Sequence, residues 1–111
     1  MLAALSGGVS TLYRDIQENL FLIQFENFYR DTQHLSVISK KEIALTIDED
    51  VIRNKDSQLR IPKGIRVTPQ IIYFNTLGGN SSLGKIYFKL RDKTVYYQLY
   101  LGNGNFKKKT D

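Results

Sequence analysis

The sequence predicts an α+β protein, in which one long N-terminal helix is followed by antiparallel strands. Up to about residue 38 apolar side chains recur every three or four residues, whereas from about residue 43 they alternate with polar ones. We therefore divide the chain into a helix over residues 1–39 and an antiparallel β domain over residues 40–111. With 111 residues, 41% of them hydrophobic, the two segments are expected to form one globular domain around a shared core.

The helix is expected to run roughly from residue 2 to residue 38. Its apolar stripe, which steps by three or four residues and so follows one helix face, consists of Leu5, Val9, Leu12, Ile16, Leu20 and Ile23. Phe25 and Phe28 widen this stripe, which predicts the deepest packing between about residues 20 and 29. We assign Leu20, Ile23, Phe25 and Phe28 to the helix–sheet core. Residues 2–12 carry no charge, and these first turns of the helix are expected to lack support from the β domain.

Several later segments alternate or are apolar and are bounded by turn residues, which predicts strands. They are residues 43–47, 51–52, 71–74, 86–90 and 95–101. The continuous apolar run at residues 71–74 predicts a strand buried on both faces. Asn103-Gly104 predicts a hairpin turn after the last segment, because both residues tolerate positive φ.

The loop GGNSSLGKI at residues 78–86 differs by one residue from a phosphate-binding loop. Gly79, Gly84 and Lys85 fit that pattern, but Ile86 stands where a hydroxyl would hold Mg²⁺. A phosphate loop must also open a helix, whereas the residues from Lys85 onward alternate as in a strand. We therefore expect a loop between two strands and no nucleotide site.

Other candidate catalytic or metal-binding residues are weak. Asp48, Glu49 and Asp50 offer carboxylates for a hard cation but lack the glycine and distal Glu of a calcium loop, which favours a solvated turn. His34 is the single histidine and is expected at the surface. The chain has no cysteine, which excludes disulfides and thiolate metal sites. We expect no enzyme activity, catalytic residue, metal or cofactor.

Tyrosines and lysines of the last strands form a candidate DNA contact. The residues are Tyr87, Lys89, Lys93, Tyr96, Tyr100, Lys107, Lys108 and Lys109. On one sheet face such rings stack on bases and such ammonium groups meet phosphates. However, the net charge of +5 is modest and the lysines near the end of the chain are expected to be mobile. We keep DNA binding as the alternative to an assembly role.

The chain resembles type IV pilins of the ComGD type, the minor pilins of Gram-positive competence pili. The stretches that carry this resemblance are LFLIQFENFYRDTQHLSVISKKEIAL, IPKGI at residues 61–65, FNTLGGNSSLGKIYF at residues 74–88 and YQLYLGNG at residues 97–104. Proteins of this kind are similar to the H-type pseudopilins of type II secretion. The resemblance therefore implies a two-sheet β domain packed on the helix.

The family begins with a basic leader, about twenty apolar residues and an early Glu, which do not stand at the start of this sequence. We expect a soluble, truncated form that lacks the upstream transmembrane half of the helix, with Met1 supplied for expression. In the full-length protein that segment would enter the membrane. Leu5, Val9, Leu12 and Ile16 would then face other helices in the filament.

The resemblance implies a structural subunit that helps to prime and assemble a pilus used for DNA uptake in natural transformation. Its implied partners are other minor pilins, in a complex at the pilus tip, and the major pilin. Its implied location is the cell membrane before assembly and the cell-surface pilus afterwards. No small-molecule substrate is implied.

Overall fold

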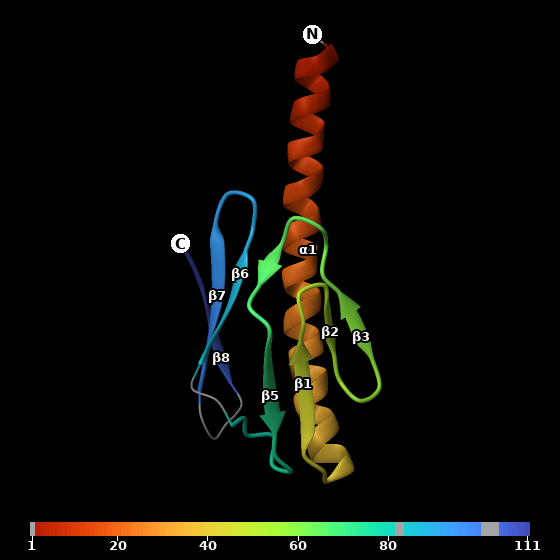
Figure 1. Cartoon of the computed structure of the whole chain (residues 1–111), viewed down its shortest axis with the longest axis vertical. Helices are drawn as coiled ribbons and strands as arrows, with labels where there is room; N and C mark the ends of the chain where they lie inside the picture. The colour runs from red at the N-terminus through yellow and green to blue at the C-terminus, as the bar shows by residue number, and fades with distance from the viewer. Residues whose placement is uncertain (1, 82–83, 101–104) are drawn as a thin grey trace.

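One long helix dominates the structure, a computed structural model that describes residues 2–81, 84–100 and 105–111 and the side chains from residue 11 onward. Helix α1 spans Leu2–Ser39, and its N-terminal part projects beyond the strands (Figure 1). The molecule measures 58 × 27 × 18 Å. The helix is followed by Lys40, whose φ of 55° lets the chain reverse into the first strand. The predicted helix is confirmed almost to the residue.

The buried face of α1 is aromatic. Phe21, Phe25 and Tyr29 are fully buried, and Phe28 packs against the core at partial exposure. Leu20 and Ile23 are 52% and 55% exposed, so their assignment to the helix–sheet core was wrong. The reason is helix geometry, since the steps that align these two residues with Ile16 carry them to the side opposite Phe25.

The first sheet has the strand order β3-β2-β1-β5 and is antiparallel throughout. Its strands are β1 (Ile43–Ile47), β2 (Val51–Arg53), β3 (Gln58–Arg60) and β5 (Gln70–Phe74). In β5, Ile72 and Phe74 are buried whereas Ile71 and Tyr73 are exposed. The expected burial of residues 71–74 on both faces was therefore wrong, because only one face of this sheet packs against the core and the other faces outward.

The second sheet has the strand order β4-β6-β7-β8 and is also antiparallel. Its strands are β4 (Arg66–Val67), β6 (Lys85–Lys89), β7 (Thr94–Leu99) and β8 (Phe106–Thr110). The alternation predicted for β6 and β7 is confirmed by their burial patterns. Asn103-Gly104, the predicted hairpin turn, lies outside the described residues.

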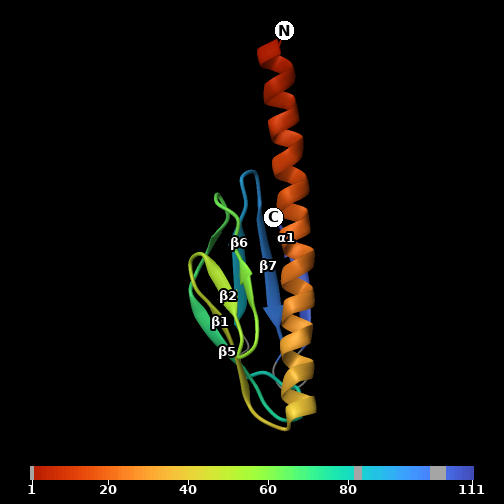
Figure 2. The same ribbon diagram turned by 90° about the vertical axis from the view of Figure 1, so that its right-hand side faces the viewer.

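Both sheets pack on one side of α1 and close a single core (Figure 2). The helix contributes its aromatic face, and the sheets contribute one row of apolar residues from each strand. Phe25 lies at the centre, with its ring centroid 4.8 Å from that of Phe88 and 5.1 Å from that of Tyr97. Phe21 also meets Phe88 edge to face. The structure is thus the two-sheet α+β layout that the sequence and its resemblance implied, consistent with a pilin-like fold.

Candidate interaction surfaces

The outer face of α1 carries an apolar stripe that stays more than half exposed within the described part of the chain. Leu12, Ile16, Leu20 and Ile23 are 61%, 58%, 52% and 55% exposed and follow one another at steps of four, four and three residues. We call these four residues the outer stripe. Leu5 and Val9 continue the same spacing toward the N-terminus, but their side chains lie outside those described. Full burial of an exposed aliphatic side chain gains about 1.5–3 kcal/mol, and roughly half of that remains available at each of these half-exposed positions, so this face is suited to contact with other apolar surfaces.

The tip of the β6–β7 hairpin is fastened to α1 where the helix leaves the domain. The backbone N–H of Arg91 donates to Glu18 Oε2 at 2.9 Å. The guanidinium of Arg91 lies 3.7 Å from Asp15 and 3.0 Å from Asp92. Its Nη1 also donates to Thr11 at 3.4 Å. The outer stripe therefore begins on a projecting helix whose base is held by the second sheet.

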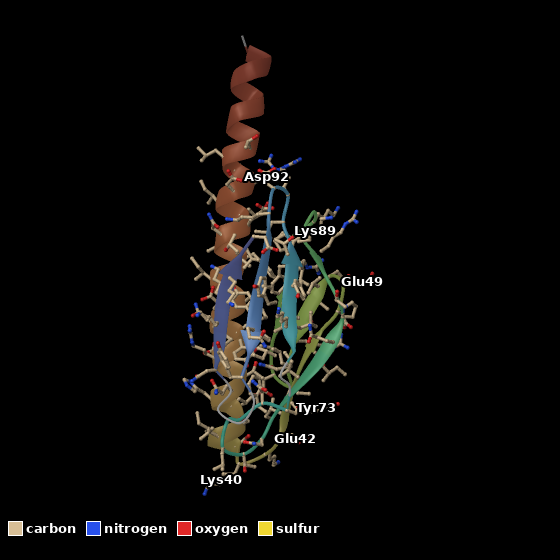
Figure 3. The ribbon with its side chains drawn as sticks, turned by 90° about the vertical axis from the view of Figure 1, so that its left-hand side faces the viewer. Lys40, Glu42, Glu49, Tyr73, Lys89 and Asp92 are labelled. Carbon is tan, nitrogen blue, oxygen red and sulfur yellow. The ribbon has the colours of Figure 1, made fainter. Side chains whose placement is uncertain are left out.

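The outer face of the second sheet gathers cations around a pair of tyrosines. Tyr87 and Tyr96 are direct cross-strand partners with ring centroids 5.4 Å apart. Because successive strand residues point to opposite faces, the residues paired with or two positions from these tyrosines share their side. The cations on this side are Lys85 and Lys89 of β6, Lys109 opposite Tyr96, Lys107 two positions before Lys109, and Arg66 opposite Lys89. We call these seven residues the basic face, and Lys89 is labelled on it in Figure 3.

The three lysines near the end of the chain point to opposite sides of the second sheet. Lys107 and Lys109 pair with Gln98 and Tyr96 on the outer side of the sheet. Lys108 points the other way and lies 3.4 Å from Glu26 on α1. These lysines belong to strand β8, so the expectation that they are mobile was wrong, because backbone pairing with β7 holds the segment.

Two other residues of the DNA candidate set lie beside the basic face. Lys93 is exposed in the β6–β7 turn, next to Asp92 (labelled in Figure 3). Tyr100 is exposed just after β7, where its N–H bonds the carbonyl of Asn105 at 3.0 Å. The sequence missed Arg66, because its place beside Lys89 depends on the pairing of a two-residue strand. Only the pairing of β4 with β6, which are far apart in the sequence, shows that Arg66 lies beside Lys89.

A polar network on the inner side ties β7 and β8 to the helix. The hydroxyl of Tyr97 donates to Glu26 Oε2 at 2.9 Å, and burial together with this carboxylate raises the pKa of Tyr97. Arg30 lies over the ring of Phe106, 5.0 Å from its centroid. Burial also raises the pKa of Tyr29 to about 12. These groups fix the strand that carries Lys107 and Lys109.

The other candidate catalytic or metal-binding residues lie in ordinary structural positions in a strand, a turn and the helix surface. Lys85 opens strand β6 and not a helix, so the geometry of a phosphate loop is missing on its C-terminal side; Ser82 and Leu83 lie outside the described residues. Asp48 pairs with Arg53 at 2.7 Å in the β1–β2 turn. His34 is exposed on α1. Among the described residues, acidic and histidine side chains do not gather in a group of three that suits a metal ion.

Comparison with known proteins gives one clear relative. The chain is 42% identical over 105 residues to the competence protein ComGD of Streptococcus pneumoniae, a match that covers 94% of this chain and 66% of that protein. It matches no protein-family model, and no solved structure is significantly similar to it. Within the described part of the chain, no helix has the length and apolar content needed to span a membrane. On this identity and fold, the chain belongs to the ComGD family of competence minor pilins.

Proposed function

We propose that the chain is a structural subunit that helps to prime and assemble a competence pilus, in a complex with other minor pilins at the pilus tip. The pilus would serve DNA uptake in natural transformation and contain a major pilin as well. The full-length protein would be held in the cell membrane before assembly and reach the cell surface within the pilus. In this role the protein turns over no substrate.

The outer stripe is the observation that carries this proposal. Leu12, Ile16, Leu20 and Ile23 lie opposite the core and extend the register of Leu5 and Val9 along the projecting helix. A neighbouring helix is the natural cover for such a narrow apolar stripe, because residues spaced by three and four form ridges that fit the grooves of another helix. Leu20 and Ile23, first assigned to the core, thus join the proposed contact with other pilins.

Charge placed on the outer stripe tests the proposal. In a transformable host that carries the full-length protein, we expect Leu20→Asp combined with Ile23→Asp to abolish pili counted by electron microscopy. A carboxylate buried among apolar helices without a partner costs several kcal/mol, whereas the separate domain loses nothing because both positions face water. Gln24→Asp, an exposed site beside the stripe, is the matched control and should leave pilus numbers unchanged. Normal piliation in the double variant would reject the proposed contact.

A further inference from the structure

Five cations of the basic face lie close together, and ion pairs elsewhere in the described structure involve other cations. Arg53 pairs with Asp48, Arg91 with Asp15 and Asp92, and Lys108 with Glu26. In the described parts of the chain, no such ion pair is formed by the cations of the basic face, namely Arg66, Lys85, Lys89, Lys107 and Lys109. The pairing of the strands thus gathers five cations, without ion pairs to described residues, on one sheet face, which suits a polyanion.

The cations stand in two rows on either side of the tyrosine pair. Arg66 and Lys89 are cross-strand partners at one end, while Lys85 and Lys107 both pair with Gln98 at the other. The rows are four strand residues apart, which is about 13 Å at a rise of roughly 3.3 Å per residue. Lys109 lies beside Tyr96 between them. A strand of nucleic acid crossing the sheet would meet cations at both ends of its path.

The exposed tyrosine pair favours nucleic acid over a phosphate-rich lipid surface as the bound polyanion. Tyr87 is 43% exposed and its ring leans at 34° against that of Tyr96. The ammonium of Lys85 lies 4.9 Å from the centroid of the Tyr96 ring. Phosphate-rich surfaces such as lipid headgroups need only the cations, whereas exposed rings between cations offer stacking to unpaired bases. Four-stranded sheets with aromatic side chains on their open face use this arrangement to bind single strands.

We propose that the basic face binds single-stranded nucleic acid, with phosphates on the two cation rows and bases on Tyr87 and Tyr96. The structure answers one of the two earlier objections to DNA contact, the expected mobility of the lysines, because Lys107 and Lys109 are held in β8 and face the same side as Tyr96. The biological setting of this site rests on the proposed role in DNA uptake. The binding itself does not.

Fluorescence anisotropy with a labelled 20-nucleotide oligothymidylate tests the binding. We expect the logarithm of affinity to fall with the logarithm of salt concentration, by about 0.7 for each phosphate neutralised. Lys85→Ala with Lys107→Ala should flatten that slope by about 1.4, because two phosphate contacts are lost. The matched control, Lys55→Ala with Arg60→Ala, removes the same charge from exposed positions in and beside the first sheet and should leave the slope nearly unchanged.

The stacking component has its own matched pair of variants. Tyr87→Ala should weaken binding of the oligonucleotide by about 5- to 150-fold, the range typical of a lost base–aromatic contact. Tyr87→Phe keeps the ring and should bind as the unmodified chain does. Tyr73→Ala is the control, because Tyr73 is equally exposed, at 43%, but lies on β5 of the other sheet. Thermal melting would verify that each variant is folded.

Three results would overturn the proposal. They are tighter binding to the matched duplex than to the single strand, full competition by polyphosphate of equal charge, and equal losses in Tyr87→Ala and Tyr73→Ala. In the host, Tyr87→Ala in the full-length protein should keep normal pilus numbers and lower transformation. Loss of pili in Leu20→Asp with Ile23→Asp tests assembly separately, so either idea can fail while the other stands.

Discussion

The two faces of α1 carry apolar side chains at the same helical spacing and have opposite surroundings. Phe21, Phe25 and Tyr29 are sealed under two sheets, whereas Ile16 and Leu20 remain more than half exposed. The inner face is aromatic and engages rings of both sheets, while the outer face is aliphatic. Large rings bury more area per residue, so they define the side that folds the domain. Apolar spacing identifies a face that needs cover but does not say what covers it.

Phe25→Ala should produce the largest loss of stability. Phe25 is fully buried between α1 and the second sheet, so its removal leaves a cavity and costs about 3–5 kcal/mol of unfolding free energy. Urea denaturation followed by circular dichroism measures this difference. A loss below about 1 kcal/mol would show that the inner face does not form the core.

Tyr97→Phe should have the next largest effect. The substitution keeps the buried ring but removes the hydroxyl that donates to Glu26. A hydrogen bond to a charged group contributes about 1.5–3 kcal/mol, and Lys108 remains to hold the carboxylate. The same urea experiment checks the value. In the Tyr97→Phe background, Glu26→Gln should remove only the partly exposed ion pair with Lys108, at about 1 kcal/mol or less.

Alkaline pH should destabilise the folded domain through the buried hydroxyl of Tyr29. The pKa of Tyr29 is about 12 in the folded chain and about 10 when unfolded, so the folded state holds this proton more tightly. The resulting stability is fully present below about pH 10 and is lost as pH rises toward 12, by about 2 kcal/mol. The measurement is the difference in pH slope between the unmodified chain and Tyr29→Phe, which isolates the contribution of this hydroxyl. An identical slope in both would contradict the burial of the hydroxyl.

Leu20→Ala and Ile23→Ala should have the smallest effects on the separate domain. Both side chains face water, so each change should alter the unfolding free energy by less than about 0.5 kcal/mol. The contrast with Phe25→Ala measures how completely the two faces differ. A loss of about 2 kcal/mol or more of unfolding free energy in Leu20→Ala would show that Leu20 belongs to the core after all.

The sequence predicted the helix and strands β1, β5, β6 and β7, because these depend on local periodicity, but it did not predict the five-residue strand β8, whose three lysines give no apolar alternation. It failed to separate the helix faces, since residues 20–29 are apolar nearly all round and both sides satisfy the same spacing. Strands β3 and β4 escaped notice because two or three residues carry no periodic signal. The basic face was found only in part, because strand pairing sends Lys108 to the helix and brings Arg66 beside Lys89. Register between distant segments is a property of the folded chain.

The contacts of Arg91 determine how the molecule would bear a mechanical load. Strands β6 and β7 run alongside α1, and their hairpin is fastened at Glu18, where the helix leaves the domain (Figure 1). Tension applied along the projecting helix would enter the sheet at this point and act parallel to the strands. Parallel loading shears the hydrogen bonds between strands together, whereas a perpendicular pull would open them one after another. The Arg91 contacts would thus share such a load with the buried rings of Phe21 and Phe25, which hold the helix to the same sheet.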